Sequence, residues 1–230
     1  MLRRHFSRLL PFAGAFLVTG LPKPACAQFT ETDAAAGIRT ALERGAELAI
    51  SSLGRTDGFL GNPKVRIPLP GFLEKAAKML KFTGASGRVD ELVTTMNRAA
   101  EGAVPEARAL LLSAVRSMSV DDGRRILTGA DDSVTQFFAS KTREPLTERL
   151  LPIVSRQTER LSLAEKYNAV AGKAAGFGLV DQRDANIEHY VTAKTLDGLY
   201  LMIAEEEKKI RTDPVGTGSA ILKKVFGGLR

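Results

Sequence analysis

Apolar residues recur at helical spacing along most of this chain, and residues 195 to 211 show the pattern most clearly. At about 3.6 residues per turn, the large apolar side chains of this stretch share one stripe. They are Leu196, Leu199, Tyr200, Ile203 and Ile210. Leu201 and Met202 flank the stripe, which predicts a central helix contacted from several sides. After residue 28 the sequence never sustains the apolar–polar alternation typical of a strand, so we expect an all-α protein.

The predicted architecture is a single compact multi-helix bundle of about 8–10 helices. Aromatic residues make up 6% of the chain and tryptophan is absent, so Leu, Ile, Val and Ala must fill most of the core. One long irregular loop is expected at 54–70, where turn residues surround Phe59, Leu60, Ile67 and Leu69. These apolar residues predict a loop that is held against the helices.

Caps and breakers place the helix boundaries. Ser119 begins a capping box, Pro105 interrupts a long helical segment, and Pro152 is expected to bend another. The predicted helices span 30–53, 70–82, 119–127, 133–140, 142–160, 162–177, 184–191, 195–211 and 219–226. Residues 88–103 and 105–118 form either two helices or one helix that is kinked at Pro105. No Pro/Ser-rich linker divides them, which predicts one domain over 29–227 and a short tail at 228–230.

Residues 1–27 have the features of a cleavable export signal. Three arginines lie within the first eight residues, a short apolar region follows at 12–18, and Ala25-Cys26-Ala27 has the small-x-small form of a cleavage site. Arg3-Arg4 leaves both the general secretory and the twin-arginine routes open. An N-terminal amphipathic helix is the alternative interpretation. Cleavage after Ala27 would leave a cysteine-free mature chain that is periplasmic or secreted.

The net charge of +7 does not predict a nucleic-acid partner. Four of these charges belong to the export signal, and acids alternate with bases in the remainder. Membrane contact is expected only through the export signal. A basic helix at 219–226 that lies on a membrane surface is an alternative, although docking on its own bundle is favoured.

The sequence predicts no metal site, cofactor or catalytic residue. His189 is the single histidine after the signal, and a lone histidine is more often structural than a ligand. Nucleotide-binding loops lack their required spacing. Gly216-Thr-Gly-Ser219 opens the basic last helix and is a candidate anion site, although its residues first of all form a turn and a cap.

One polar set stands out against this background. Asn97, Arg98 and Glu101 lie on one predicted helix, and Tyr167, Asn168 and Lys173 lie on another. These six residues are the candidate ligand-binding residues, on the hypothesis that they line a polar pocket between helices. The alternative is that they bridge helices and hold their packing register.

Several segments resemble an uncharacterised family of exported bacterial proteins known as a domain of unknown function, DUF4197. The segments are 57–63 (DGFLGNP), 65–70 (VRIPLP), 96–101 (MNRAAE), 126–129 (ILTG), 151–154 (LPIV), 167–168 (YN), 179–181 (LVD), 196–199 (LDGL), 204–207 (AEEE) and 213–216 (DPVG). The resemblance implies an all-helical exported protein, and it supplies no activity or site residues.

The sequence therefore favours a non-enzymatic binding or interaction module of the cell envelope, with an unknown protein or small-molecule partner. One alternative is a carrier that holds a small amphipathic ligand or lipid in a helical pocket. A second alternative is a hydrolytic enzyme whose site the sequence does not reveal. An assembled nucleophile, metal set or cofactor loop would favour catalysis, and none is evident in the sequence.

Overall fold

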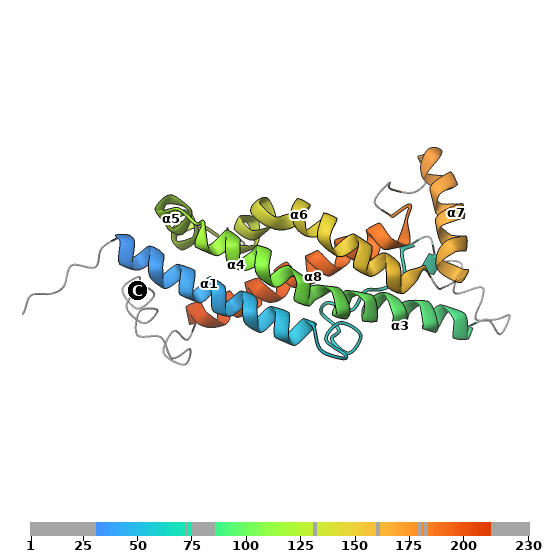
Figure 1. Cartoon of the computed structure of the whole chain (residues 1–230), viewed down its shortest axis with the longest axis horizontal. Coiled ribbons are helices and arrows are strands. Elements are labelled where there is room, and N and C mark those ends of the chain that lie inside the picture. The colour runs from blue at the N-terminus through green and yellow to red at the C-terminus, as the bar shows by residue number, and fades with distance from the viewer. Residues whose placement is uncertain are drawn as a thin grey trace, which may run out of the picture.

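The computed structural model describes residues 31–71, 73–74, 86–130, 133–159, 162–178, 181 and 184–212. This part of the chain contains seven α-helices and one 3-10 helix and no strand, which confirms the all-α prediction (Figure 1). The elements are α1 (Glu31–Leu53), α3 (Ser86–Ala103), η1 (Val104–Ala107), α4 (Arg108–Arg116), α5 (Val120–Thr128), α6 (Ser133–Thr158), α7 (Ser162–Gly176) and α8 (Ile187–Thr212).

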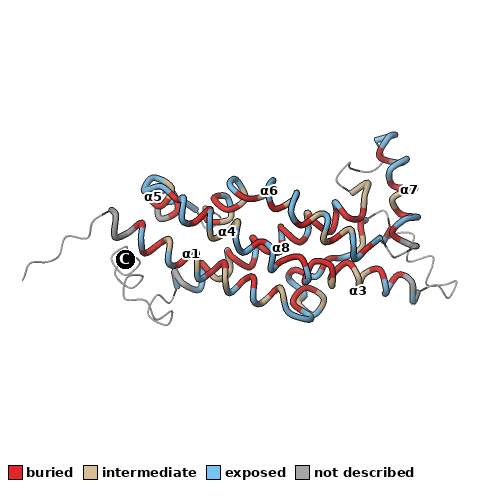
Figure 2. Tube along the Cα trace, in the orientation of Figure 1, coloured by how far each residue is buried: buried red, intermediate tan, exposed pale blue. Residues whose placement is uncertain are grey.

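Helix α8 is the centre of the bundle and packs against α1, α3, α6 and α7. Its inward residues Leu196, Leu199 and Ile203 are buried, whereas Leu201 is 43% exposed. Figure 2 shows buried and exposed residues recurring along the helices of the bundle. The separate helix expected at 184–191 is wrong, because residues from Ile187 onward form the first turns of α8. The Asn186 side chain accepts a hydrogen bond from the His189 amide and so caps α8 at that point.

Helix α6 is also longer than expected. The sequence predicted two helices, at 133–140 and 142–160, but the structure has one helix of 26 residues that contains both Pro145 and Pro152. Both prolines are exposed, and their spacing of seven residues places them on one face. The carbonyl groups that lose their amide partners therefore face water, which lowers the cost of an interior proline.

The other predicted breaks are confirmed. Pro105 lies in the 3-10 turn η1, which joins α3 to α4. Ser119 and Asp122 form the complete capping box that begins α5. Gly178, after α7, has a φ of 72°, as expected for a glycine that ends a helix.

The loop at 54–70 is irregular and lies against the bundle, as predicted. Phe59 and Ile67 are 0% and 1% exposed, and Leu60 and Leu69 are partly buried. The loop approaches α8 at Gly198, where an added Cβ would lie 2.8 Å from the Phe59 ring. A glycine in α8 therefore makes room for the loop.

Several predictions fall outside the described residues. They are the export signal at 1–27 with its cleavage site at Ala27, most of the helix at 70–82, the candidate anion site at 216–219, the helix at 219–226 and the tail at 228–230. Among the described helices, none is both long enough and apolar enough to span a membrane.

Candidate functional site

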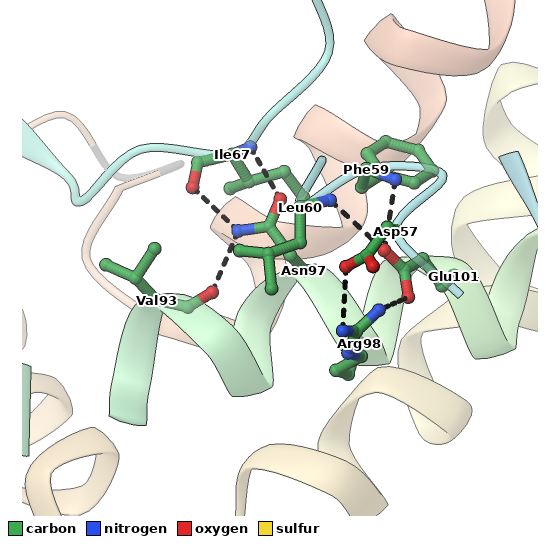
Figure 3. Close-up of polar contacts among 8 residues, drawn as sticks. All are labelled: Asp57, Phe59, Leu60, Ile67, Val93, Asn97, Arg98 and Glu101. Atoms are coloured by element: carbon green, nitrogen blue, oxygen red, sulfur yellow. Dashed lines mark hydrogen bonds and ion pairs between the residues drawn. The ribbon is translucent and has the colours of Figure 1, made fainter. Parts of the chain in front are cut away.

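The first three candidate residues bind the 54–70 loop to α3 (Figure 3). Asn97 is fully buried, and its Oδ1 accepts a hydrogen bond from the Ile67 amide at 2.8 Å. Its Nδ2 donates to the carbonyl oxygens of Ile67, at 3.0 Å, and Val93, at 2.8 Å. A single amide side chain thus pairs with both main-chain groups of one loop residue, as a neighbouring strand would.

Glu101 holds the other end of the same loop. Its Oε1 accepts hydrogen bonds from the Phe59 amide at 3.0 Å and the Leu60 amide at 3.1 Å. Its Oε2 is 2.6 Å from an Arg98 guanidinium nitrogen, and Arg98 also donates to Asp57 Oδ1 at 2.8 Å (Figure 3). We call this set the loop clamp, defined by Asp57, Asn97, Arg98 and Glu101.

The loop clamp keeps its charges paired. The hydrogen bond from Arg98 to Glu101, and to a smaller extent the one to Asp57, raises the pKa of the Arg98 guanidinium. Asp57 has a φ of 64°, a conformation that Asp and Asn adopt more readily than most residues. Its carboxylate lies next to Arg98 in that conformation. The Asn97 amide and both Glu101 oxygens are used within the chain, so the clamp can position a backbone segment and offers few groups to a ligand.

Two of the other candidates join α7 to α8. Asn168 Oδ1 accepts a hydrogen bond from the Ile187 amide at 2.8 Å, and its Nδ2 donates to Glu188 Oε2 at 2.8 Å. Glu188 is 8% exposed, and its Oε1 accepts a hydrogen bond from the Thr158 hydroxyl of α6 at 3.2 Å. The Tyr167 hydroxyl donates to the Asp184 carbonyl. These residues form the α7–α8 junction.

Buried tyrosines surround this junction. Burial, followed by the negative charge of Asp184, raises the pKa of Tyr167 to about 12. Burial also raises the pKa of Tyr190 to about 12, with a smaller contribution from Asp184. Since the Tyr190 hydroxyl donates to the Pro68 carbonyl at 3.1 Å, the start of α8 is bonded to the end of the loop.

The structure does not bring the six candidates into one pocket. Asn97, Arg98 and Glu101 belong to the loop clamp, whereas Tyr167 and Asn168 belong to the α7–α8 junction. Lys173 is exposed near the end of α7 and makes no hydrogen bond to another described residue. An open hollow of about 280 Å³ adjoins the junction, and Asn168, Glu159 and His189 help to line it.

A larger groove, which sequence reasoning missed, lies between α5 and α6. Its volume is about 450 Å³. We call it the α5–α6 groove. It is lined by Asp122, Arg125, Ile126, Gly129, Ala130, Ser133, Gln136, Phe137, Ser140 and Lys141.

Helical spacing contains part of the signal for this groove. Asp122, Arg125 and Ile126 are three and four residues apart on α5. Phe137 and Lys141 are four residues apart on α6, so each helix contributes one stripe. That the two stripes face each other depends on the turn between the helices, which spacing does not specify.

Metal ligands do not cluster within the described residues: no three His, Cys, Asp or Glu side chains lie where they could hold an ion. The described residues thus form an all-helical protein. Its buried polar side chains hold a loop and the start of α8 in place, and a separate open groove lies between α5 and α6.

The chain belongs to the family DUF4197, described as a protein of unknown function, and the match covers residues 28–227. The family resemblance inferred from the sequence motifs is thereby confirmed. No curated protein and no solved structure matches the chain.

Proposed function

We propose that this protein is a non-enzymatic binding module of the bacterial cell envelope and that its partner binds in the α5–α6 groove. The observation that carries this proposal is the groove itself, an open space of about 450 Å³ with polar and apolar side chains on its walls. Binding sites of this kind combine apolar contact area with a few polar groups that orient the partner.

The use of polar groups elsewhere in the molecule supports this choice. In the loop clamp, Asn97 and Glu101 are bonded to the chain's own backbone. In the α5–α6 groove, Arg125 and Lys141 are exposed and form no ion pair with another described residue. Cations without an ion-pair partner among the described residues are available to a bound molecule, whereas the clamp's amide and carboxylate are already occupied.

The packing of the described core favours binding at the surface over carriage inside the bundle. An apolar opening lined by Ile38, Leu42, Val134 and Ile203 has a volume of about 10 Å³. That volume holds about one water molecule, and an acyl chain needs far more. An amphipathic ligand would therefore find room in the α5–α6 groove and not in this opening.

Features of the first 27 residues support the proposed cell-envelope location. Residues 1–27 combine a basic start, a short apolar region and a small-x-small cleavage site, which supports export and removal of the leader after Ala27. Detection of a mature N-terminus at Gln28 in the periplasmic fraction, by mass spectrometry, would test this part separately. A full-length chain retained in the cytoplasm would contradict it.

Blocking the groove tests the binding function. Four probes share one fluorophenyl body and carry a carboxylate, an ammonium, a carboxamide or a hydroxyl group, and their binding is followed by fluorine NMR. We expect at least one probe to bind the wild-type protein and to lose binding in Ala130→Trp, which fills an exposed position in the groove.

The matched control is Ala169→Trp, at an exposed position of α7 at the opposite end of the bundle from α5 (Figure 1). This variant should bind the same probe as tightly as the wild type does. The proposal fails if no probe of any class binds, or if binding persists in Ala130→Trp.

A further inference from the structure

The chemistry of the α5–α6 groove identifies the class of molecule that fits it, and this inference rests on the proposed binding function. Three charged side chains line the groove: Asp122 and Arg125 from α5, and Lys141 from α6. Two cations and one carboxylate give the lining a formal charge of one positive unit.

One oxygen of the single carboxylate in this lining is already occupied. Asp122 Oδ2 accepts hydrogen bonds from the Ser119 amide at 3.1 Å and the Ser119 hydroxyl at 2.8 Å, which completes the capping box of α5. These two bonds are the main reason that the pKa of Asp122 is lowered, and the charges of Lys141 and Arg125 lower it further. Both cations therefore lie near enough to Asp122 to act on its carboxylate.

The two cations differ from several other arginines of the bundle. Arg98 is paired with Asp57 and Arg149 with Glu106, each at 2.8 Å. Neither Arg125 nor Lys141 forms an ion pair with another described residue, and both are exposed. Two cations that line one groove, with Asp122 as the only acidic residue of the described lining, favour an anion from solution.

The groove also has an apolar part, which Ile126 and Phe137 contribute. Ile126 is 3% exposed and Phe137 is 8% exposed, so each shows only a narrow strip of hydrocarbon to the groove. Gly129 and Ala130 also line the groove and bring little side-chain volume to it. A bound molecule thus meets cations at one position and hydrocarbon at another, and a purely polar ion would leave the hydrocarbon exposed to water.

We propose that the α5–α6 groove binds a small amphipathic anion, whose carboxylate or phosphate head lies between Arg125 and Lys141 and whose apolar body covers Ile126 and Phe137. A ring with a short acidic side chain, of about ten heavy atoms, fits the volume of the groove. For so few atoms at an open site we expect a dissociation constant on the order of 1 mM.

The first experiment compares head groups on one body by fluorine NMR titration. The probes are 4-fluorophenylacetate, the neutral 4-fluorophenylacetamide and the cationic 4-fluorophenethylammonium. We expect the carboxylate to bind at least tenfold more tightly than the amide, and the ammonium to bind more weakly than either. Equal binding of carboxylate and amide would overturn the inference.

The second experiment changes the protein. Arg125→Gln with Lys141→Gln should weaken 4-fluorophenylacetate at least tenfold, and each single variant should weaken it by a smaller factor. The matched control is Arg156→Gln, an exposed arginine of α6 that does not line the groove. The inference is wrong if the double variant binds as the control does. Circular dichroism before each titration confirms that the variant is folded.

Two further measurements separate rival sources of the signal. Inorganic phosphate should compete only weakly, because it lacks the apolar body, and full displacement at concentrations equal to the probe would overturn the amphipathic part. The chain also carries Asp131 and Asp132, outside the described residues and next to the groove in sequence. Changing both to Asn should leave probe binding equal or tighter, and loss of binding would contradict an external anion.

The outcomes also separate this inference from the proposed function. If the ammonium probe binds best and Ala130→Trp abolishes its binding, the groove is a binding site for another class of ligand and only this inference falls. If no probe binds, the proposed function fails as well.

Discussion

Replacing Asn97 by alanine tests whether the loop clamp stabilises the fold. The substitution removes the partners of the Ile67 amide and the Ile67 carbonyl, and Ile67 is 1% exposed. A buried polar group left without a partner costs about 1–3 kcal/mol, so the two together predict a loss of about 2–6 kcal/mol. Partial entry of water places the expected value near 3 kcal/mol, a large share of the roughly 5–15 kcal/mol of a typical domain.

The assay is urea unfolding of the purified protein, followed by circular dichroism at the helical minimum. Thr94→Ala, at an exposed position of the same helix, is the matched control and should change the free energy of unfolding by less than about 0.5 kcal/mol. A loss for Asn97→Ala within about 1 kcal/mol of this control would refute the reasoning. It would mean that the loop is held by its apolar side chains and not by the amide.

Asn97→Asp sharpens the test because it keeps the shape of the side chain. One carboxylate oxygen still accepts from the Ile67 amide, but the other faces the carbonyl oxygens of Ile67 and Val93. That environment raises the pKa of the new carboxyl group above its unfolded value of about 4. Below the raised pKa the carboxyl group is protonated in the folded protein and can donate to a carbonyl oxygen. The variant should therefore lose more stability relative to wild type at pH 7 than at pH 4.

Three further predictions concern packing and titration. Gly198→Ala adds a Cβ 2.8 Å from the buried Phe59 ring and should cost about 1–2 kcal/mol net, whereas Gly102→Ala, with open space around it, should stabilise by up to about 1 kcal/mol in the same urea assay. Leu199→Ala should cost about 2–5 kcal/mol as a core cavity, and a loss like that of the exposed Leu201→Ala would mean that α8 is not the centre. In absorbance titration at 295 nm, the folded protein should show no tyrosine that ionises at the ordinary pKa near 10. The free energy of unfolding should fall as the pH rises from about 10 to 12, because in that range the tyrosines ionise readily only in the unfolded chain. A tyrosine that titrates near 10 before unfolding would contradict the burial of Tyr167, Tyr190 and Tyr200.

The sequence was most informative where local chemistry decides the structure. Ser119 and Asp122 form their capping box from residues three positions apart, and Pro105 lies in the 3-10 turn that separates α3 from α4. Apolar spacing likewise identified the buried face of α8. Each of these features depends on neighbours within one or two turns, which a single sequence displays directly.

The wrong boundaries arose where the outcome depends on which face meets water. Pro145 and Pro152 would break a buried helix, but both lie on the exposed face of α6, and the helix continues through them. The exposure of that face is set by α8 and α3 packing on the other side. Sequence spacing shows that the two prolines share a face, but only the assembled bundle shows that this face is outside.

The roles of the candidate residues depended on contacts between segments that are far apart in the sequence. Asn97 was identified as an unusual polar residue on an apolar helix, and its partner is the backbone of Ile67, 30 residues away. Backbone groups leave no trace in a pattern of side chains, so the sequence could not choose between a pocket and a tie. The α5–α6 groove was missed for a related reason. Spacing within each helix predicts which residues share a face, but it does not predict how α5 and α6 pack against each other.

The structure separates the residues that hold the fold from those proposed to bind a partner. The loop clamp fastens 54–70 to α3, whereas the groove lies between α5 and α6 at one end of the bundle (Figure 1). No lining residue of the groove belongs to the clamp, so their effects should be additive. Asn97→Ala should therefore lower stability and leave the affinity for 4-fluorophenylacetate unchanged at temperatures where it stays folded. Arg125→Gln with Lys141→Gln should do the reverse, because both side chains are exposed and unpaired among the described residues. If either the single or the double variant changed both stability and affinity, the loop and the groove would have to be coupled through α6, the helix on which both α3 and α5 pack.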